Sequence, residues 1–129
     1  MAALTELIEA ARKEDWDLVD EKIPELVKDP SVVNWAYDSG IDDEDGNVRD
    51  FAASILEKAR ISKERFDDMR ETIYGHMGSD SNKYVRFRSA FALAAHGVGS
   101  HRDEVERVLH EAEKDEDTAD IARGYLGKI

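Results

Sequence analysis

The chain has 129 residues, of which 41% are hydrophobic and 37% charged, with two prolines and no cysteine. A chain of this length buries about two thirds of its unfolded surface without covalent staples, so we expect one domain over residues 1–129. The missing cysteines exclude disulfides and thiolate chemistry. The formal net charge of −12 would repel a phosphate backbone, which argues against nucleic-acid and anionic-membrane partners.

The N-terminal segment lacks the basic start and continuous apolar core of a signal peptide, and no stretch approaches the roughly 20 apolar residues that cross a bilayer. We therefore expect a cytoplasmic protein. Apolar residues spaced three and four apart predict eight consecutive helices. The first covers residues 1–12. The second follows Asp15, and Pro24 is expected to kink or end it. The third opens at Asp29 and Pro30 and stops at Gly40.

The fourth helix follows the acidic run 42–45, in which Asp45 is the expected N-cap, and Ser62 is the expected cap of the fifth helix. Gly75 and Gly78 predict the end of the fifth helix. The sixth helix, about residues 82–96, is apolar on two sides, which predicts that it is the most buried element.

A single apolar stripe predicts that the seventh helix is an outer one, with Ser100 as its cap. The eighth helix contains Gly124, which lowers its helix propensity. Its expected apolar face consists of Ile121, Ala122, Tyr125, Leu126 and Ile129.

An internal repeat organises these helices. The residues Asp45, Val48, Arg49, Ala53 and Leu56 recur 37 positions later as Asn82, Val85, Arg86, Ala90 and Leu93. Weaker copies begin at Asp15 and Asp115. A period of this size is typical of helical repeats, so we expect four inner helices, each preceded by an outer one.

The pattern Asp-x-x-Val-Arg-x-x-x-Ala-x-x-Leu resembles the second helix of the HEAT-like repeat family, of the type found in phycobilin lyases. The resemblance implies an all-α fold, a right-handed α-α superhelix (α-solenoid) of about four helix pairs. It also implies that Arg49 and Arg86 join a polar ladder with the motif Asp or Asn of a neighbouring repeat. The terminal copies carry Val19 and Ala119 in place of the arginine, and atypical ends are expected of capping repeats.

Residues suited to catalysis or metal binding are few. No two of the histidines at 76, 96, 101 and 110 have the i, i+4 spacing of a helical metal site. His110 and Glu111 form a His-Glu dipeptide of the kind that HEAT-repeat di-iron hydroxylases carry in several repeats, but this chain has only one. A catalytic metal normally needs three protein ligands, so we expect no metal, no cofactor and no catalytic residue.

The acidic run before the fourth helix does not fit a calcium loop. With Gly46 at the sixth position of an EF-hand loop, the first ligand would be Ile41 and the twelfth Ala52, and neither carries a carboxylate. The attraction of a helix N-terminus for negative charge explains the run without a metal. Weak divalent binding by the dense acids stays open as an alternative.

These observations favour a non-enzymatic protein-protein interaction or scaffold module, because helical repeats present extended binding surfaces. An enzyme or enzyme-accessory subunit of the HEAT-like lyase or hydroxylase type is the alternative, and a HEAT-like DNA glycosylase is disfavoured by the net charge. The acids near the helix starts either cap their helices or form an edge that steers a basic protein partner. The candidate edge consists of Asp42, Asp43, Glu44, Asp115, Glu116 and Asp117. The sequence defines neither the partner nor the oligomeric state.

Overall fold

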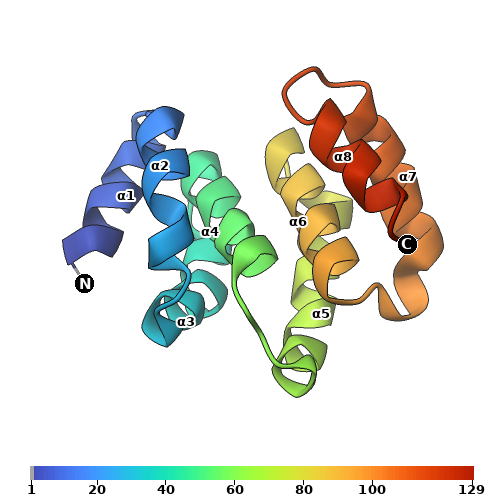
Figure 1. Ribbon diagram of the computed structural model, residues 1–129, viewed down its shortest axis with the longest axis horizontal. Coiled ribbons are helices and arrows are strands. Elements are labelled where there is room, and N and C mark those ends of the chain that lie inside the picture. Colours follow the sequence, from blue (N-terminus) through green and yellow to red (C-terminus); the bar gives the residue numbers. More distant parts are fainter. Residues whose placement is uncertain (1) are drawn as a thin grey trace. The chain divides into compact units, whose positions relative to one another are not determined.

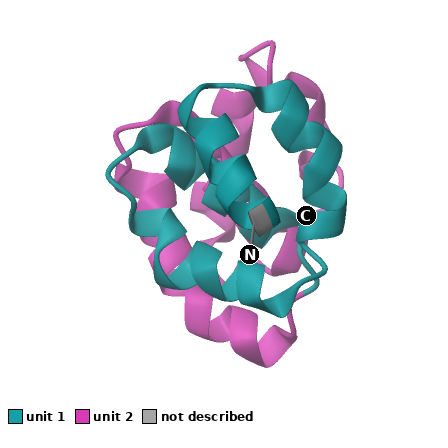
Figure 2. Ribbon diagram, turned by 90° about the vertical axis from the view of Figure 1, so that its left-hand side faces the viewer, with its two compact units in different colours: residues 1–60 teal, residues 61–129 magenta. Residues whose placement is uncertain are grey.

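The computed structural model describes residues 2–129, and their side chains from Ala3 onward (Figure 1). It contains eight α-helices and two short 3-10 turns, with no strand in residues 2–129, which confirms the all-helical prediction. None of the helices described is long and apolar enough to cross a membrane. The chain divides into two compact units, Met1–Arg60 (unit 1) and Ile61–Ile129 (unit 2), coloured separately in Figure 2. The expectation of one domain stays a prediction.

Unit 1 is built around α4. Its elements are α1 (Ala2–Arg12), α2 (Trp16–Leu26), α3 (Pro30–Asp38), the 3-10 turn η1 (Gly40–Asp42) and α4 (Gly46–Lys58). α1 packs against both α2 and α4, and α3 packs against α4 (Figure 1). The main partners of α4 are therefore α1 and α3.

Side-chain caps set the helix starts in unit 1 where the sequence predicts them. The carboxylates of Asp15, Asp29 and Asp45 accept from backbone amides in the first turns of α2, α3 and α4. Such a cap satisfies one of the amides that lack a partner inside the helix. Pro24 lies near the end of α2, which stops two residues later, as expected of a residue that cannot donate to the helix.

The turn from α3 to α4 depends on a close approach of backbone and side chains. Gly40 is buried, and a Cβ built on it would lie 2.7 Å from the Trp35 ring and 2.8 Å from Cβ of Ala52. The Trp35 ring also contacts Phe51, with ring centroids 5.8 Å apart. Only glycine fits this position without moving the aromatic packing.

Unit 2 consists of α5 (Lys63–Ser79), α6 (Lys83–His96), the 3-10 turn η2 (Gly99–His101), α7 (Arg102–Glu113) and α8 (Ala119–Leu126). α6 packs against α5, α7 and α8, and α7 packs along α8 (Figure 1). Ser62 caps α5 as predicted, and Asn82, which the sequence placed inside the sixth helix, caps α6.

The predicted end of α5 is wrong, because the helix continues through Gly75 and Gly78 to Ser79. Each glycine costs about 1 kcal/mol of helix propensity, whereas burying a methionine side chain gains roughly 1.5–3 kcal/mol. The extra turn places Met77 in the core, four residues after buried Ile73. The Ser79 hydroxyl also donates to the carbonyl of Gly75 at 2.8 Å.

The most buried helix is α4, not the predicted α6. Nine of the 13 residues of α4 are buried, against seven of the 14 in α6. The difference comes from polar side chains, because α4 also buries Asp50, Ser54 and Glu57. An apolar pattern cannot predict the burial of such groups.

Two predictions for the last helices are also corrected. Ser100 does not cap α7, because it lies inside η2 and α7 begins at Arg102 without a side-chain cap. α7 itself buries one apolar stripe, as expected of an outer helix. In α8 only Ala122 is buried, and Ile121 is 37% exposed, so the predicted apolar face is only partly covered.

Candidate functional site

The acidic loop before α4, residues 42–45, is ordered by its own side chains. Asp43 Oδ1 accepts from the amide of Asp45 at 2.9 Å, and Asp45 Oδ1 accepts from the amide of Asn47 at 2.8 Å. Two successive carboxylates thus hold the backbone in the turn that starts the helix. The carboxylates of Asp43 and Asp45 therefore have a structural role in this turn.

The loop before α6 repeats this structure 37 residues later. Asp80 Oδ1 accepts from the amide of Asn82 at 2.9 Å, and Asn82 Oδ1 accepts from the amide of Tyr84 at 2.8 Å. Sequence periodicity therefore corresponds to a recurring set of hydrogen bonds.

The two motif arginines make equivalent bonds. Nη1 of Arg49 donates to the carbonyl of Asp43 at 2.8 Å, and Nη1 of Arg86 donates to the carbonyl of Asp80 at 2.8 Å, in both cases six residues back. Arg49 also reaches the carbonyl of Glu44 at 3.1 Å. A guanidinium that satisfies loop carbonyls has a packing role. The ladder with a neighbouring repeat stays a prediction.

The loop before α8 is built differently. Asp115 Oδ1 accepts from the amide of Asp117 at 3.0 Å, but neither carboxylate caps α8. Thr118, the residue before α8, donates its buried hydroxyl to the carbonyl of Ala112 at 2.8 Å. The prediction that the acids here cap their own helix is therefore wrong, because they order the turn instead.

Acids in the loops before α4 and α8 pair with basic groups of the same unit, and one also accepts a hydrogen bond from a hydroxyl group. In unit 1 the Arg12 guanidinium lies 3.6 Å from carboxylate oxygens of both Asp43 and Asp45. In unit 2 the Lys83 ammonium lies 2.9 Å from Asp115 Oδ2. The Tyr84 hydroxyl donates to Asp117 Oδ2 at 3.1 Å.

These contacts shift the titration of the unit 2 groups. The hydrogen bond and charge of Lys83 lower the pKa of Asp115, and Asp115 in turn raises the pKa of Lys83. Desolvation, followed by its contacts with the two acids, raises the pKa of Tyr84. The charged forms of Asp115 and Lys83 stabilise each other at neutral pH.

The six acids of the candidate edge therefore have different roles. Asp43 and Asp115 are only partly exposed and hold turns, whereas Asp42, Glu44, Glu116 and Asp117 are exposed. Three acids belong to unit 1 and three to unit 2, and their alignment along one edge stays a prediction. The sequence pattern did not indicate the role of Arg12 and placed Tyr84 in an apolar stripe. Arg12 reaches Asp43 across 31 positions and Tyr84 reaches Asp117 across 33.

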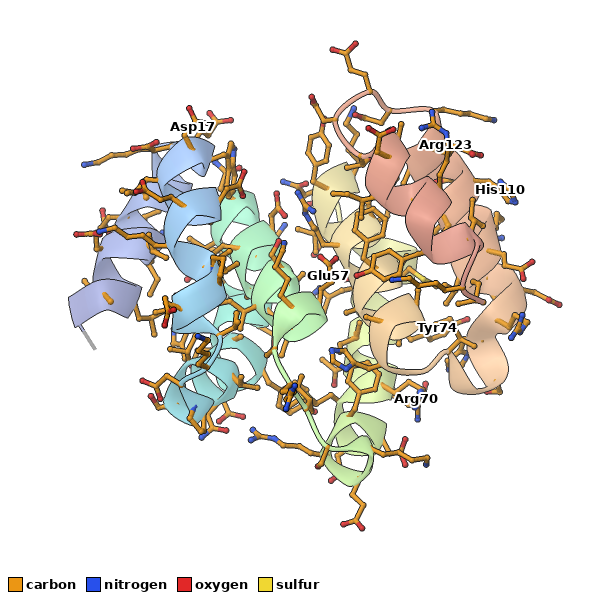
Figure 3. The ribbon with its side chains drawn as sticks, viewed as in Figure 1. Asp17, Glu57, Arg70, Tyr74, His110 and Arg123 are labelled. Atoms are coloured by element: carbon orange, nitrogen blue, oxygen red, sulfur yellow. The ribbon has the colours of Figure 1, made fainter. Side chains whose placement is uncertain are left out.

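The four histidines lie in four separate contacts. His76 pairs with Asp80 at 2.9 Å, His96 lies against Phe66, His101 stacks on Tyr74 and pairs with Glu71, and His110 lies 3.4 Å from Glu113. Figure 3 shows His110 on the solvent side of α7. Within residues 2–129 no group of three His, Asp or Glu side chains is placed to hold a metal ion.

Comparison with known proteins gives no match: no family model, no curated protein and no solved structure is similar to this chain.

Proposed function

We propose that the chain is a non-enzymatic protein-protein interaction module built from HEAT-like helix pairs that stack as an α-solenoid. The pairs would be α1–α2, α3–α4, α5–α6 and α7–α8. The observation that supports the repeat is the arginine-to-carbonyl bond, which has the same donor atom, length and offset in Arg49 and Arg86. Repeat folds carry their functions on surfaces and not in a central cavity.

The distribution of perturbed groups favours binding over catalysis. Catalytic sites gather titratable side chains with shifted pKa values in one cleft. Here the shifted groups have local structural causes, such as the Ser31 hydrogen bonds that lower the pKa of Asp29, and Arg70 with Lys63, which lower that of Asp67. Both carboxylates stay at the surface.

The exposed acids Asp42, Glu44 and Glu116 supply the docking charge in this proposal. They attract a basic protein partner and raise its rate of association, an effect that falls with salt. The absence of nucleic-acid binding stays a prediction that follows from the net charge of −12. The cytoplasmic location stays a prediction from an N-terminal segment that does not resemble a signal peptide and from the lack of a long apolar stretch.

The test has two stages. Affinity capture from the native lysate at two salt concentrations, read by mass spectrometry, identifies partners that bind at low salt. The association rate is then measured for the wild type and for the triple variant Asp42→Asn, Glu44→Gln, Glu116→Gln. Asp43 is left intact because its carboxylate holds the amide of Asp45 and contacts Arg12.

The matched control removes the same charge from the exposed face of α7 through Asp103→Asn, Glu106→Gln and Glu111→Gln. We expect the acidic-loop variant to slow association several-fold at low salt, and the control to change it less. Equal rates for wild type and acidic-loop variant would contradict the docking role and leave the acids as turn-forming groups.

A further inference from the structure

A groove of about 430 Å³ runs between the first two helices of unit 1, away from the acidic loop before α4. It is lined by Ala3 and Leu7 of α1, by Glu21, Lys22, Glu25 and Leu26 of α2, and by Asp29. Its volume is within the range of about 300–1,000 Å³ that binding pockets span.

The groove combines an apolar floor with an acidic rim. Leu7 and Leu26 form the floor, and Ala3 is exposed beside them. Asp29, the N-cap of α3, lines the groove, and so do the longer side chains of Glu21 and Glu25, which lie one turn apart on α2. The aliphatic stems of such long side chains extend an apolar floor while their charged ends stay in water.

Among the lining residues, three carboxylates outnumber the single cation. Lys22, the cation in the lining, is held by Glu6 of α1 at 2.5 Å. Glu21 forms no ion pair within residues 2–129. Glu25 pairs with Lys28 at 3.1 Å, but the two side chains are 84% and 70% exposed, so the pair is weak.

Asp29 keeps its negative charge as well. Its carboxylate accepts from the amide and hydroxyl of Ser31, at 2.9 and 2.7 Å, and these bonds lower its pKa. The rim thus presents three carboxylates beside one cation that is already engaged.

We propose that this groove binds a basic amphipathic helix of a protein partner, whose apolar side chains lie on the floor and whose Lys and Arg side chains contact the rim. Helix-in-groove recognition uses this combination of apolar anchors and flanking charge. The inference rests on the proposed interaction function and names a second surface for it, separate from the exposed acids of the loops. A second copy of the chain is a poor occupant because both of its units carry net negative charge.

The experiment titrates the full chain, labelled with ¹⁵N, with a synthetic helical peptide of leucine and lysine that has its leucines on one face. A peptide of the same composition in scrambled order is the control for charge alone. We expect chemical-shift changes at the groove residues of α1 and α2 with the amphipathic peptide, and weaker, scattered changes with the scrambled one.

Charge reversal on the rim is the decisive comparison. Glu21→Lys with Glu25→Lys should weaken binding at least about tenfold at low salt, while circular dichroism shows an unchanged helix content. The control Asp103→Lys with Glu111→Lys makes the same charge change on exposed residues of α7 in unit 2 and should weaken binding much less.

Equal affinity of the rim variant and wild type, equal binding of the scrambled peptide, or shift changes confined to other residues would each overturn the groove proposal. A captured partner that still binds the rim variant would also overturn it while leaving the interaction module intact. Failure to capture any protein counts against the proposed function and is independent of where the peptide binds.

Discussion

Units 1 and 2 differ in charge although both are helical and share the same loop structure. Residues 1–60 contain seven Lys and Arg against sixteen Asp and Glu, a formal net charge of −9, and no histidine. Residues 61–129 contain eleven against fourteen, a net charge of −3, and all four histidines. The chain therefore concentrates its negative charge in unit 1.

In unit 2, three of the basic side chains bind backbone carbonyls or a carboxylate of the same unit. Arg70 donates to the carbonyl of Gly97 at 3.0 Å, Arg86 to that of Asp80, and Lys83 pairs with Asp115. Figure 3 shows Arg70 directed toward the loop after α6. In unit 1, by contrast, residues 2–29, which comprise α1, α2 and the turns after them, carry nine acids and four basic residues. The comparison indicates that basic partners should prefer unit 1.

The largest expected effect tests whether the apolar cores of the two units contribute equally to stability although the units differ in net charge. Phe51 and Phe91 are fully buried, one in each unit. Phe51→Ala and Phe91→Ala should each lower the free energy of unfolding by about 3–5 kcal/mol, measured by urea denaturation. Ile121→Ala, at the exposed face of α8, is the control and should cost about 0.5 kcal/mol. A small loss for either phenylalanine would contradict its central position.

Two glycines sharpen the comparison because the same substitution should act in opposite directions. Gly40→Ala in unit 1 forces a Cβ against Trp35 and should destabilise by about 1–3 kcal/mol. Gly75→Ala in α5 of unit 2 meets no atom within 4 Å and should stabilise by about 0.5–1 kcal/mol through helix propensity. Thermal unfolding of both variants gives the signs, and two changes of the same sign would be inconsistent with this packing.

The motif arginine predicts a moderate effect. Arg86→Gln leaves the carbonyl of Asp80 without its charged donor and should cost about 1–2 kcal/mol of unfolding free energy. Arg123→Gln removes a guanidinium whose pair with Asp120 is exposed, and should cost less than about 0.5 kcal/mol. Equal losses of unfolding free energy for the two variants in denaturant titrations would show that the bond from Arg86 to the loop carbonyl does not stabilise the fold.

The smallest effect concerns pH. Because the folded pKa of Asp115 is lowered, its contribution is complete above its unfolded value of about 4 and is lost as pH falls through the folded pKa. Asp115→Asn should cost about 0.5 kcal/mol at pH 7, and the difference from wild type should shrink below pH 4. Lys83→Met should likewise make the free energy of unfolding depend less on pH in the acid range. A pH-independent difference would exclude the ion pair as the cause.

The sequence alone determined the helical class, the helix starts near Asp15 and Asp29, the caps at Asp45 and Ser62, and the single apolar stripe of α7. These features are local, because a cap involves amides two or three residues away and a helix stripe repeats within four. The internal repeat also predicted the equivalence of Arg49 and Arg86, since the same loop recurs with the same spacing.

Tertiary structure decided the rest, because the groups involved meet across long separations. Burial of Met77 extends α5 past two glycines, and Ser100 lies in the turn η2, whose His101 stacks on Tyr74, and so does not cap α7. Arg12 reaches the loop before α4, and Lys83 with Tyr84 reaches the loop before α8. These contacts divide the acids into turn-forming and exposed groups. No pattern within one helix specifies such pairings, because they depend on how one helix packs on another.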